Sequence, residues 1–295
     1  MLCVILAILA ACAVRAGSHA PGPAAPRPIA TRSFIVGAAA LSGRSFIAAT
    51  GVHPAVVEHY ARVGQPFSVI FAGDAIPFLQ IEPRNVPLAS VISGQEDRWL
   101  RSYAQSVARY GKPIVLGFAP EMNGSWYDWG YRHVTPVTYI AAWRHVVATF
   151  RSEKAANVTW LWTVNVERLT SDNPAPTVSR ISPWWPGEQW VTWVGIDGYY
   201  FSPLQYFHAL FGPTIREARK LTNQPILISE TGVSPSAGKA VKIPDLFAGA
   251  RSEGMAGVVW FDLIGKHNWE LNTPAVIAAF RKSCCLGTAK ISRHP

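Results

Sequence analysis

Residues 113–121, PIVLGFAPE, set a continuous apolar run directly before a glutamate, and this stretch decides the interpretation of the fold. An uninterrupted apolar run of this kind is typical of a strand that is buried on both faces of a parallel sheet. The stretch therefore predicts an α/β protein in which Glu121 follows the carboxyl end of a buried strand.

Seven other short apolar runs lie along the chain, and helical patterns separate most of them. We expect strands at 34–40, 67–73, 86–92, 113–119, 158–166, 193–200, 225–230 and 257–263. We expect helices at 53–63, 95–110, 136–154, 204–221, 239–253 and 273–283. Eight strand–helix units over about 250 residues predict a (β/α)8 TIM barrel in a single domain, residues 32–284. An open doubly wound sheet is the alternative, but no glycine-rich phosphate turn follows the first strand.

The active site of such a barrel lies at the carboxyl ends of its strands, where Glu121 and Glu230 are found. Strand alternation places Gly117 on the same face as Glu121, and Ile226 and Ile228 on the same face as Glu230. Two carboxyl groups about 5–5.5 Å apart, one protonated and one ionised, can cleave a glycosidic bond with retention. A glutamate stabilised by a helix dipole and a solvated loop carboxylate are the structural alternatives. Because both glutamates end strands, we favour the catalytic pair.

Four motifs in order along the chain resemble glycoside hydrolase family 26, the family of β-mannanases and related endo-glycanases. They are PEMNGSWYDWG (120–130), WPGEQWVTWVGIDGYY (185–200), PILISETG (225–232), and VVWFD with NWELNTPAVIAAFRK (258–282). The resemblance covers about residues 86–283. It implies that Glu121 is the general acid/base and Glu230 the nucleophile. It also implies that Trp126 lines the site, Tyr199 hydrogen-bonds the nucleophile and Trp260 is the aromatic floor under the sugar.

Three further residues lie at the mouth of the predicted barrel. Trp129 is a candidate for stacking on sugar rings, with packing in the core or a loop as the alternative, which also applies to Trp126 and Trp260. Asn165 ends the fifth predicted strand and is a candidate contact for a sugar hydroxyl. Asp197 is interpreted as a buried structural acceptor.

Two positions depart from the pattern of the family. The histidine that usually precedes the acid/base is replaced by Pro120, and the arginine four residues before it by Gly117. Proline cannot donate a hydrogen bond to a sugar, and the loss of the arginine removes one interaction that keeps the carboxylates ionised. These changes bear on the choice of substrate and leave the two glutamates in place.

The prediction is an exported, retaining endo-β-glycosidase that hydrolyses a β-mannan-type polysaccharide without a metal or an organic cofactor. A non-catalytic carbohydrate-binding lipoprotein on the same barrel is one alternative. The other is an endo-glycosidase for a different glycan, such as β-1,3-xylan, mixed-linkage β-glucan or a cell-envelope polymer.

The composition supports a folded protein that acts outside the cell. Hydrophobic residues make up 49% of the chain and charged residues 15%, which argues against disorder, and 12 tryptophans suit the binding of sugars. The net charge of +9 suits an anionic surface such as a cell envelope. The basic residues are scattered, so we expect no nucleic-acid partner. We expect a monomer.

The ends of the chain carry separate signals. The apolar run 2–14 has the size of a signal-peptide core, so residues 1–16 are interpreted as a secretion or lipoprotein signal. We favour lipidation of Cys12, with anchorage in the membrane, over cleavage after Ala16. Residues 17–31 read as a Pro/Ala/Gly-rich linker, and residues 285–295 as an unstructured tail. No disulfide or metal spacing is present among the four cysteines.

Overall fold

A computed structural model of the chain describes residues 33–167 and 178–285. Its eight parallel strands form a closed barrel in sequence order, and β8 pairs with β1. The strands are β1 (Ile35–Ala39), β2 (Val56–Arg62), β3 (Ile76–Glu82), β4 (Ile114–Phe118), β5 (Val158–Asn165), β6 (Trp193–Tyr200), β7 (Ile226–Val233) and β8 (Gly257–Phe261). The predicted (β/α)8 barrel is confirmed.

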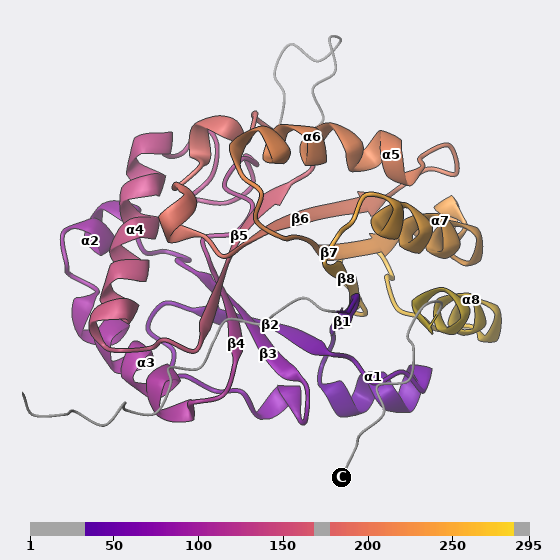
Figure 1. The fold of residues 1–295 in the computed structure, drawn as a ribbon, viewed down its shortest axis with the longest axis horizontal. Coiled ribbons are helices and arrows are strands. Elements are labelled where there is room, and N and C mark those ends of the chain that lie inside the picture. The colour runs from indigo at the N-terminus through magenta and orange to yellow at the C-terminus, as the bar shows by residue number, and fades with distance from the viewer. Residues whose placement is uncertain (1–32, 168–177, 286–295) are drawn as a thin grey trace, which may run out of the picture.

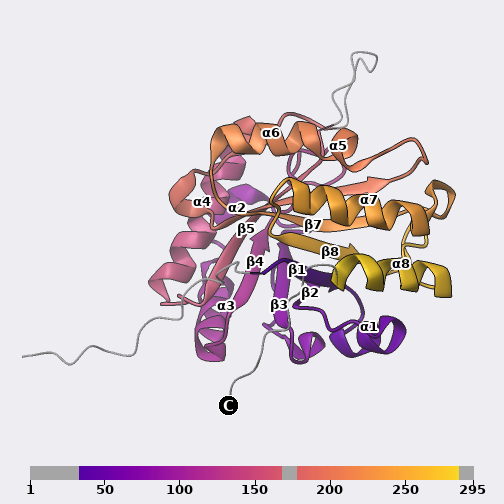
Figure 2. The same cartoon turned by 45° about the vertical axis from the view of Figure 1, so that its right-hand side comes forward.

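Helices surround the strands on all sides in the two views of the molecule (Figures 1 and 2). They are α1 (Gly43–Thr50), α2 (Leu88–Ile92), α3 (Asp97–Tyr110), α4 (Pro136–Ser152), α5 (Phe207–Leu210), α6 (Gly212–Leu221), α7 (Lys239–Ser252) and α8 (Pro274–Cys285). In both views α3 and α4 lie on one side of the barrel and α7 and α8 on the other. Among the described residues, none of the helices has the length and hydrophobicity needed to span a bilayer.

Two hydrophobic cores hold the barrel together, one between strands and helices and a smaller one inside. The inner core is formed by Ile35, Val56, Phe78, Val115, Leu161, Trp193, Leu227, Ala256 and Val259. These residues lie at or near the amino ends of the strands and close the bottom of the barrel. The inward-facing residues nearer the carboxyl ends include polar side chains such as Glu58, Gln80 and Thr163, so the barrel interior becomes polar toward the site.

Two predicted strands and one predicted helix are wrong. Residues 53–63, predicted as a helix, contain strand β2, and strand β3 was not predicted at all. The predicted strand 67–73 contains only a short 3-10 turn, Ile70–Ala72, and Ile70 is 92% exposed. The predicted strand 86–92 contains α2, whose Leu88 and Val91 are buried three residues apart, as in a helix.

The other six strands and the remaining helices agree with the prediction to within a few residues, except that α1 was not predicted and residues 204–221 form two helices, α5 and α6. The predicted signal (1–16, with Cys12), the linker (17–31) and residues 286–295 of the tail lie outside the described residues. These assignments, the domain limits and the expected monomer stay predictions.

Candidate active site

Glu121 lies three residues beyond β4, in a turn with an unusual backbone. Ala119 and Glu121 have φ angles of 48° and 54°, in the left-handed region that side chains other than glycine seldom adopt. Two hydrogen bonds fix the turn: the Glu121 amide donates to the Thr163 carbonyl (2.9 Å), and Trp129 Nε1 donates to the Pro120 carbonyl (2.7 Å). The turn, and not strand alternation from Gly117, directs Glu121 to the mouth of the barrel.

The Glu121 carboxyl group is buried and receives two side-chain hydrogen bonds. Trp126 Nε1 donates to Oε2 (2.8 Å), and Asn165 Nδ2 donates to Oε1 (2.5 Å). Asn123 in turn holds Asn165, because Oδ1 of Asn123 accepts a hydrogen bond from the backbone N–H of Asn165 (2.9 Å). Burial, followed by the negative charge of Glu230, raises the pKa of Glu121 to about 7, although both hydrogen bonds oppose the rise. This carboxyl group can therefore hold and release a proton near neutral pH.

Glu230 reaches the same mouth through an irregularity in β7. In the pairing of β6 with β7, Ile196 lies opposite Ile228 and Asp197 lies opposite Glu230, so Ser229 is an extra residue. Ile228 packs in the outer core, whereas Ser229 and Glu230 both contact inward-facing groups. The predicted common face of Ile226, Ile228 and Glu230 is therefore wrong, because this bulge reverses the alternation.

The two oxygens of Glu230 each accept a hydrogen bond from a tyrosine hydroxyl. Tyr199 donates to Oε1 and Tyr60 donates to Oε2. Burial raises the pKa of Glu230, and the two hydroxyl groups oppose that rise because they stabilise the ionised form. The pair thus consists of Glu230, whose ionised form receives two hydroxyl hydrogen bonds, and Glu121, whose proton is held by burial and by the charge of Glu230.

The other predicted site residues divide into two groups. Trp126 is 45% exposed beside Glu121, and Tyr199 contacts Glu230, so both lie where the resemblance implies. Asn165 contacts Glu121, and its contact with a sugar hydroxyl stays a prediction. Trp129 is 2% exposed and stacks on Tyr127 (4.4 Å between ring centroids), so it supports the turn and presents no face to a sugar.

Trp260 is not part of the site. Its side chain is fully buried in the outer core, packs edge-on against Phe280 of α8 (5.9 Å), and donates from Nε1 to the Trp269 carbonyl (3.0 Å). Residues alternate along β8, and Trp260 points outward from the barrel. The predicted aromatic floor is therefore wrong for this residue.

Trp260→Ala is expected to lower the free energy of unfolding by about 3–5 kcal/mol, because it empties a large space in the core. Denaturant unfolding measures this loss. Trp260→Phe serves as the control and should recover most of the stability, since Phe fills most of the space. A variant with normal stability but a KM raised tenfold would place Trp260 at the sugar after all.

Trp269 and Tyr60 are residues near the site that the sequence analysis missed. The Trp269 ring lies 4.5 Å from that of Tyr199, and Phe201 lies beside both rings. Trp269 is within the quoted motif NWELN, so its position there was the available signal. Tyr60 lies on β2, which was predicted as a helix, and no sequence signal placed it at a strand end.

A cleft of about 500 Å³ opens beside Glu230. Its lining residues are Tyr60, Arg62, Gln65, Glu82, Arg84, Tyr127, Glu230 and Phe261. Arg84 binds Glu82 through two parallel hydrogen bonds of 2.7 Å and lies over the ring of Tyr127 (5.2 Å). The aromatic rings in this lining can pack on the apolar faces of sugars. The amide of Gln65 and the charged pair can form hydrogen bonds with sugar hydroxyl groups.

The structure shows what occupies the space beside Gly117. A Cβ atom built on Gly117 would lie 1.9 Å from Oε1 of Gln80 and 3.2 Å from the Leu161 carbonyl. The Gln80 side chain therefore fills the space that a side chain at position 117 would need. The other departure, Pro120, supplies only its carbonyl, which accepts from Trp129.

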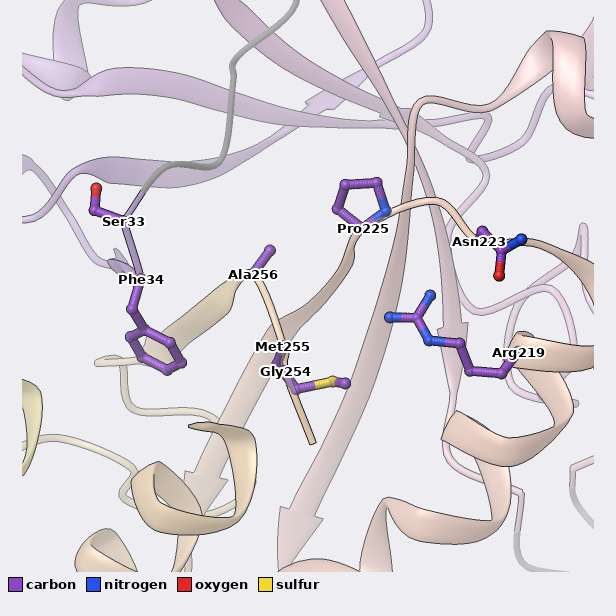
Figure 3. A pocket seen from close by; sticks show the side chains of 8 residues that line it. All are labelled: Ser33, Phe34, Arg219, Asn223, Pro225, Gly254, Met255 and Ala256. Atoms are coloured by element: carbon purple, nitrogen blue, oxygen red, sulfur yellow. The ribbon is translucent and has the colours of Figure 1, made fainter. Parts of the chain in front are cut away.

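A second cavity, of about 390 Å³, lies at the amino ends of the strands (Figure 3). Phe34, Pro225 and Ala256 precede β1, β7 and β8 there, and Arg219 reaches in from α6. It is at the opposite end of the barrel from both glutamates, and none of its lining residues carries a carboxyl group. The cleft beside Glu230 is therefore the candidate active site.

A parallel eight-stranded barrel with two buried glutamates at the ends of β4 and β7 has the fold and site of a glycoside hydrolase. The family comparison agrees, because the model of glycosyl hydrolase family 26 matches residues 97–230. This chain belongs to glycosyl hydrolase family 26.

Known proteins similar to this chain support the assignment. Endoglucanase H of Acetivibrio thermocellus is 31% identical over 75% of this chain, and the chain spans only 25% of the length of that relative. A β-mannanase of this family from Bacteroides ovatus has a TM-score of 0.63 at 15% identity, covering 85% of this chain and 88% of that one. The modular endo-β-1,4-mannanase of Cellulomonas fimi has a TM-score of 0.67 at 15% identity, covering 86% and 71%. At these identities the solved structures show the common fold.

Proposed function

We propose that the protein is a retaining endo-β-glycosidase in which Glu230 is the nucleophile and Glu121 the general acid/base. The observation that carries the proposal is the unequal environment of the two carboxyl groups. Two tyrosine hydroxyls stabilise Glu230 as a carboxylate, while Glu121 holds a proton up to about pH 7. A double displacement requires this division between an ionised and a protonated group.

The reaction follows from these positions. Glu230 attacks the anomeric carbon and forms a glycosyl ester, while the bond to the leaving oxygen breaks and Glu121 transfers its proton to that oxygen. Water then attacks the same carbon, and Glu121 accepts a proton from that water. The bond between sugar and Glu230 breaks, and both glutamates return to their initial states. Trp126 and Asn165 keep the Glu121 carboxyl group in place through both steps.

Mechanism-based labelling tests this proposal. A 2-deoxy-2-fluoro glycoside with a good leaving group should form a stable ester with Glu230, which peptide mass spectrometry locates. NMR of the first product should show the β-anomer, because two displacements retain configuration. Polysaccharide binding without an adduct or hydrolysis would support instead the non-catalytic carbohydrate-binding protein.

For the substrate we propose a β-linked hexose polymer, with β-mannan and β-glucan as the two candidates. The fold relatives are named as mannanases, which supports β-mannan. The relative with higher identity is named as an endoglucanase, and the replacement of the family histidine by Pro120 also bears against mannan. Hydrolysis of soluble mannan, mixed-linkage β-glucan, carboxymethyl cellulose and β-1,3-xylan, with analysis of product lengths, distinguishes these polymers and endo from exo action. Action on a polymer that cannot enter cells agrees with the export expected from residues 2–14.

The pH dependence of kcat/KM is expected to show a limb of decreasing activity near pH 7. Glu121 must be protonated for the first step, and its pKa is raised to about 7, so activity falls as the pH rises through that value. On the acid side, activity falls as Glu230 becomes protonated. Initial rates on a soluble glycan between about pH 4 and pH 9 measure both limbs.

Trp126→Phe provides the control for this assignment. It removes a hydrogen bond that lowers the pKa of Glu121, so the alkaline limb should move to higher pH. An alkaline limb that stays in place in Trp126→Phe would assign it to a group other than Glu121.

A further inference from the structure

Glu58, on β2, is a buried carboxyl group beneath the two glutamates to which the proposed mechanism gives no role. It is 1% exposed and lies on the inward face of the strand, two residues before Tyr60. Neither of its carboxyl oxygens has a hydrogen-bond partner of good geometry, and Oε1 of its neighbour Gln80 has none either. The Gln80 side chain lies close enough to interact with the Glu58 carboxyl group. Buried polar atoms are almost always paired, so three unpaired acceptors in one place require an explanation.

The Gln80 side chain is held from two sides. Its Nε2 donates to Thr163 Oγ1 (2.9 Å), and its Oε1 lies over the bare backbone of Gly117. As an ionised carboxylate, Glu58 could only accept hydrogen bonds, and the amide oxygen of Gln80 also only accepts. A proton on Glu58 would supply a donor to the unpaired Oε1 of Gln80.

The charges around Glu58 are also negative. Glu230 on β7 and Glu121 after β4 act on its carboxyl group, and Asp197 on β6 interacts with it in turn. The nearest tyrosine on its own strand, Tyr60, contacts Glu230. The guanidinium group at the site mouth, Arg84, binds Glu82 with both of its hydrogen bonds. An ionised Glu58 would therefore be a buried charge amid like charges, which is a costly arrangement.

We propose that Glu58 is an uncharged carboxylic acid that donates its proton to Oε1 of Gln80 and so leaves Glu230 as the ionised group of the site. Glu58 is then a positioning residue, which acts through Gln80 and through its effect on Glu230. Burial, then the charge of Glu230, raises the pKa of Glu58 well above its usual value although the Gln80 side chain opposes the rise, in agreement with this state. The uncharged acid keeps a second negative charge away from the nucleophile.

A reversed Gln80 amide is the competing arrangement. Its Nε2 would then donate to an ionised Glu58, and its Oε1 would accept from Thr163. One neutral donor would serve a carboxylate with two oxygens, and the repulsion from Glu230 and Glu121 would persist. A protonated Glu58 can donate to Oε1 of Gln80 without reversal of the amide, so we favour this arrangement.

Infrared difference spectroscopy tests the protonation state without any substrate. The spectrum of the wild type minus that of Glu58→Gln at about pH 8.5, above the pKa of Glu121, should show the C=O stretch of a protonated carboxyl group. Glu82→Gln is the matched control, because Glu82 is a buried carboxylate on the next strand that is ion-paired with Arg84. Its difference spectrum should show only the loss of carboxylate bands. A carboxylate band in place of the C=O stretch for Glu58 would overturn the proposal.

Thermal unfolding gives an independent readout. The folded-state pKa of Glu58 is above its unfolded value of about 4.3, so the wild type loses stability as the pH rises above that value, whereas Glu58→Gln does not. The Tm of the variant relative to the wild type should therefore increase from pH 4 to pH 8. A Tm difference that stays constant or decreases over this range would contradict an uncharged Glu58.

The effect on catalysis rests on the proposed function, but the two measurements above do not. Glu58→Ala should lower kcat/KM at least tenfold, because Gln80 and the neighbouring Tyr60 lose their support, and Glu58→Gln should recover most of the loss. Both limbs of the pH profile of Glu58→Gln should stay within about 0.3 pH units of the wild type. A shift of both limbs to lower pH would show that a negative charge had been removed, and would overturn the proposal.

Discussion

Glu230→Ala is expected to lower kcat on a soluble β-glycan by about 10⁴–10⁶-fold, the scale observed for the loss of a covalent nucleophile. The hydroxyls of Tyr60 and Tyr199 hold both oxygens of Glu230, so its position is fixed before substrate binds. Asp197 lies opposite Glu230 in the pairing of β6 with β7, but it is 3% exposed, accepts from Ser229 (2.6 Å), and has a pKa raised by burial. Asp197 is therefore a poor substitute nucleophile.

Sodium azide provides the test that separates a missing nucleophile from a damaged fold. In Glu230→Ala an azide ion can enter the space of the lost carboxylate and attack an activated aryl β-glycoside from the same side, which gives an α-glycosyl azide. Azide should leave the wild type unaffected. Residual hydrolysis within tenfold of the wild type, in a variant with normal thermal unfolding, would remove Glu230 from the role of nucleophile.

Glu121→Ala is expected to have an effect that depends on the leaving group. On a polysaccharide the rate should fall by about 10²–10⁴-fold, since the group proposed to protonate the departing oxygen is lost. On an aryl glycoside with an acidic phenol, the first step needs no proton and should proceed. The glycosyl ester then accumulates, because no base activates water, and a burst of phenol followed by a slow steady rate should appear.

Stopped-flow absorbance measures the burst, and reducing-sugar release measures the polysaccharide rate. Glu121→Gln is the matched control, because it keeps the shape of the side chain but cannot donate a proton as an acid. It should also lose the polysaccharide rate while keeping the burst on the aryl glycoside. Equal losses on both substrates would contradict the role of Glu121 as general acid/base.

Strand β4, which is apolar on both faces, was predictable from sequence, whereas β2 and β3 were not. The run 113–119 shows continuous hydrophobicity because its residues meet helices on one side and the inner core on the other. β2 and β3 place Glu58, Tyr60, Gln80 and Glu82 inside the barrel, which interrupts the apolar pattern. The polar residues of β2 and β3 that surround the site are therefore the reason why these two strands were not predicted.

The meeting of Glu121 and Glu230 at one mouth of the barrel was predictable, because the first follows and the second lies in a clear strand within specific motifs. The environment of the pair was not. Trp260 and Trp269 have the same chemistry and lie nine residues apart, and only the direction of β8 and the loop that follows it shows which one approaches Tyr199. Tyr60, which contacts Glu230 from a strand 170 positions earlier in the chain, lies beyond the reach of local patterns.

The extra residue in β7 makes the position of Glu230 sensitive to chain length at one point. Deletion of Ser229 would leave the rest of the strand able to pair, with Ile226 and Ile228 still in the outer core. The nucleophile would then occupy the position next to Ile228 that Ser229 fills now, deeper in the barrel and away from the Tyr60 and Tyr199 hydroxyls. We expect such a shortened protein to keep the packing of its core. Its Glu230 carboxyl group would no longer reach the two tyrosine hydroxyls. The number of residues between the hydrophobic part of this strand and Glu230 therefore decides which way the glutamate side chain points.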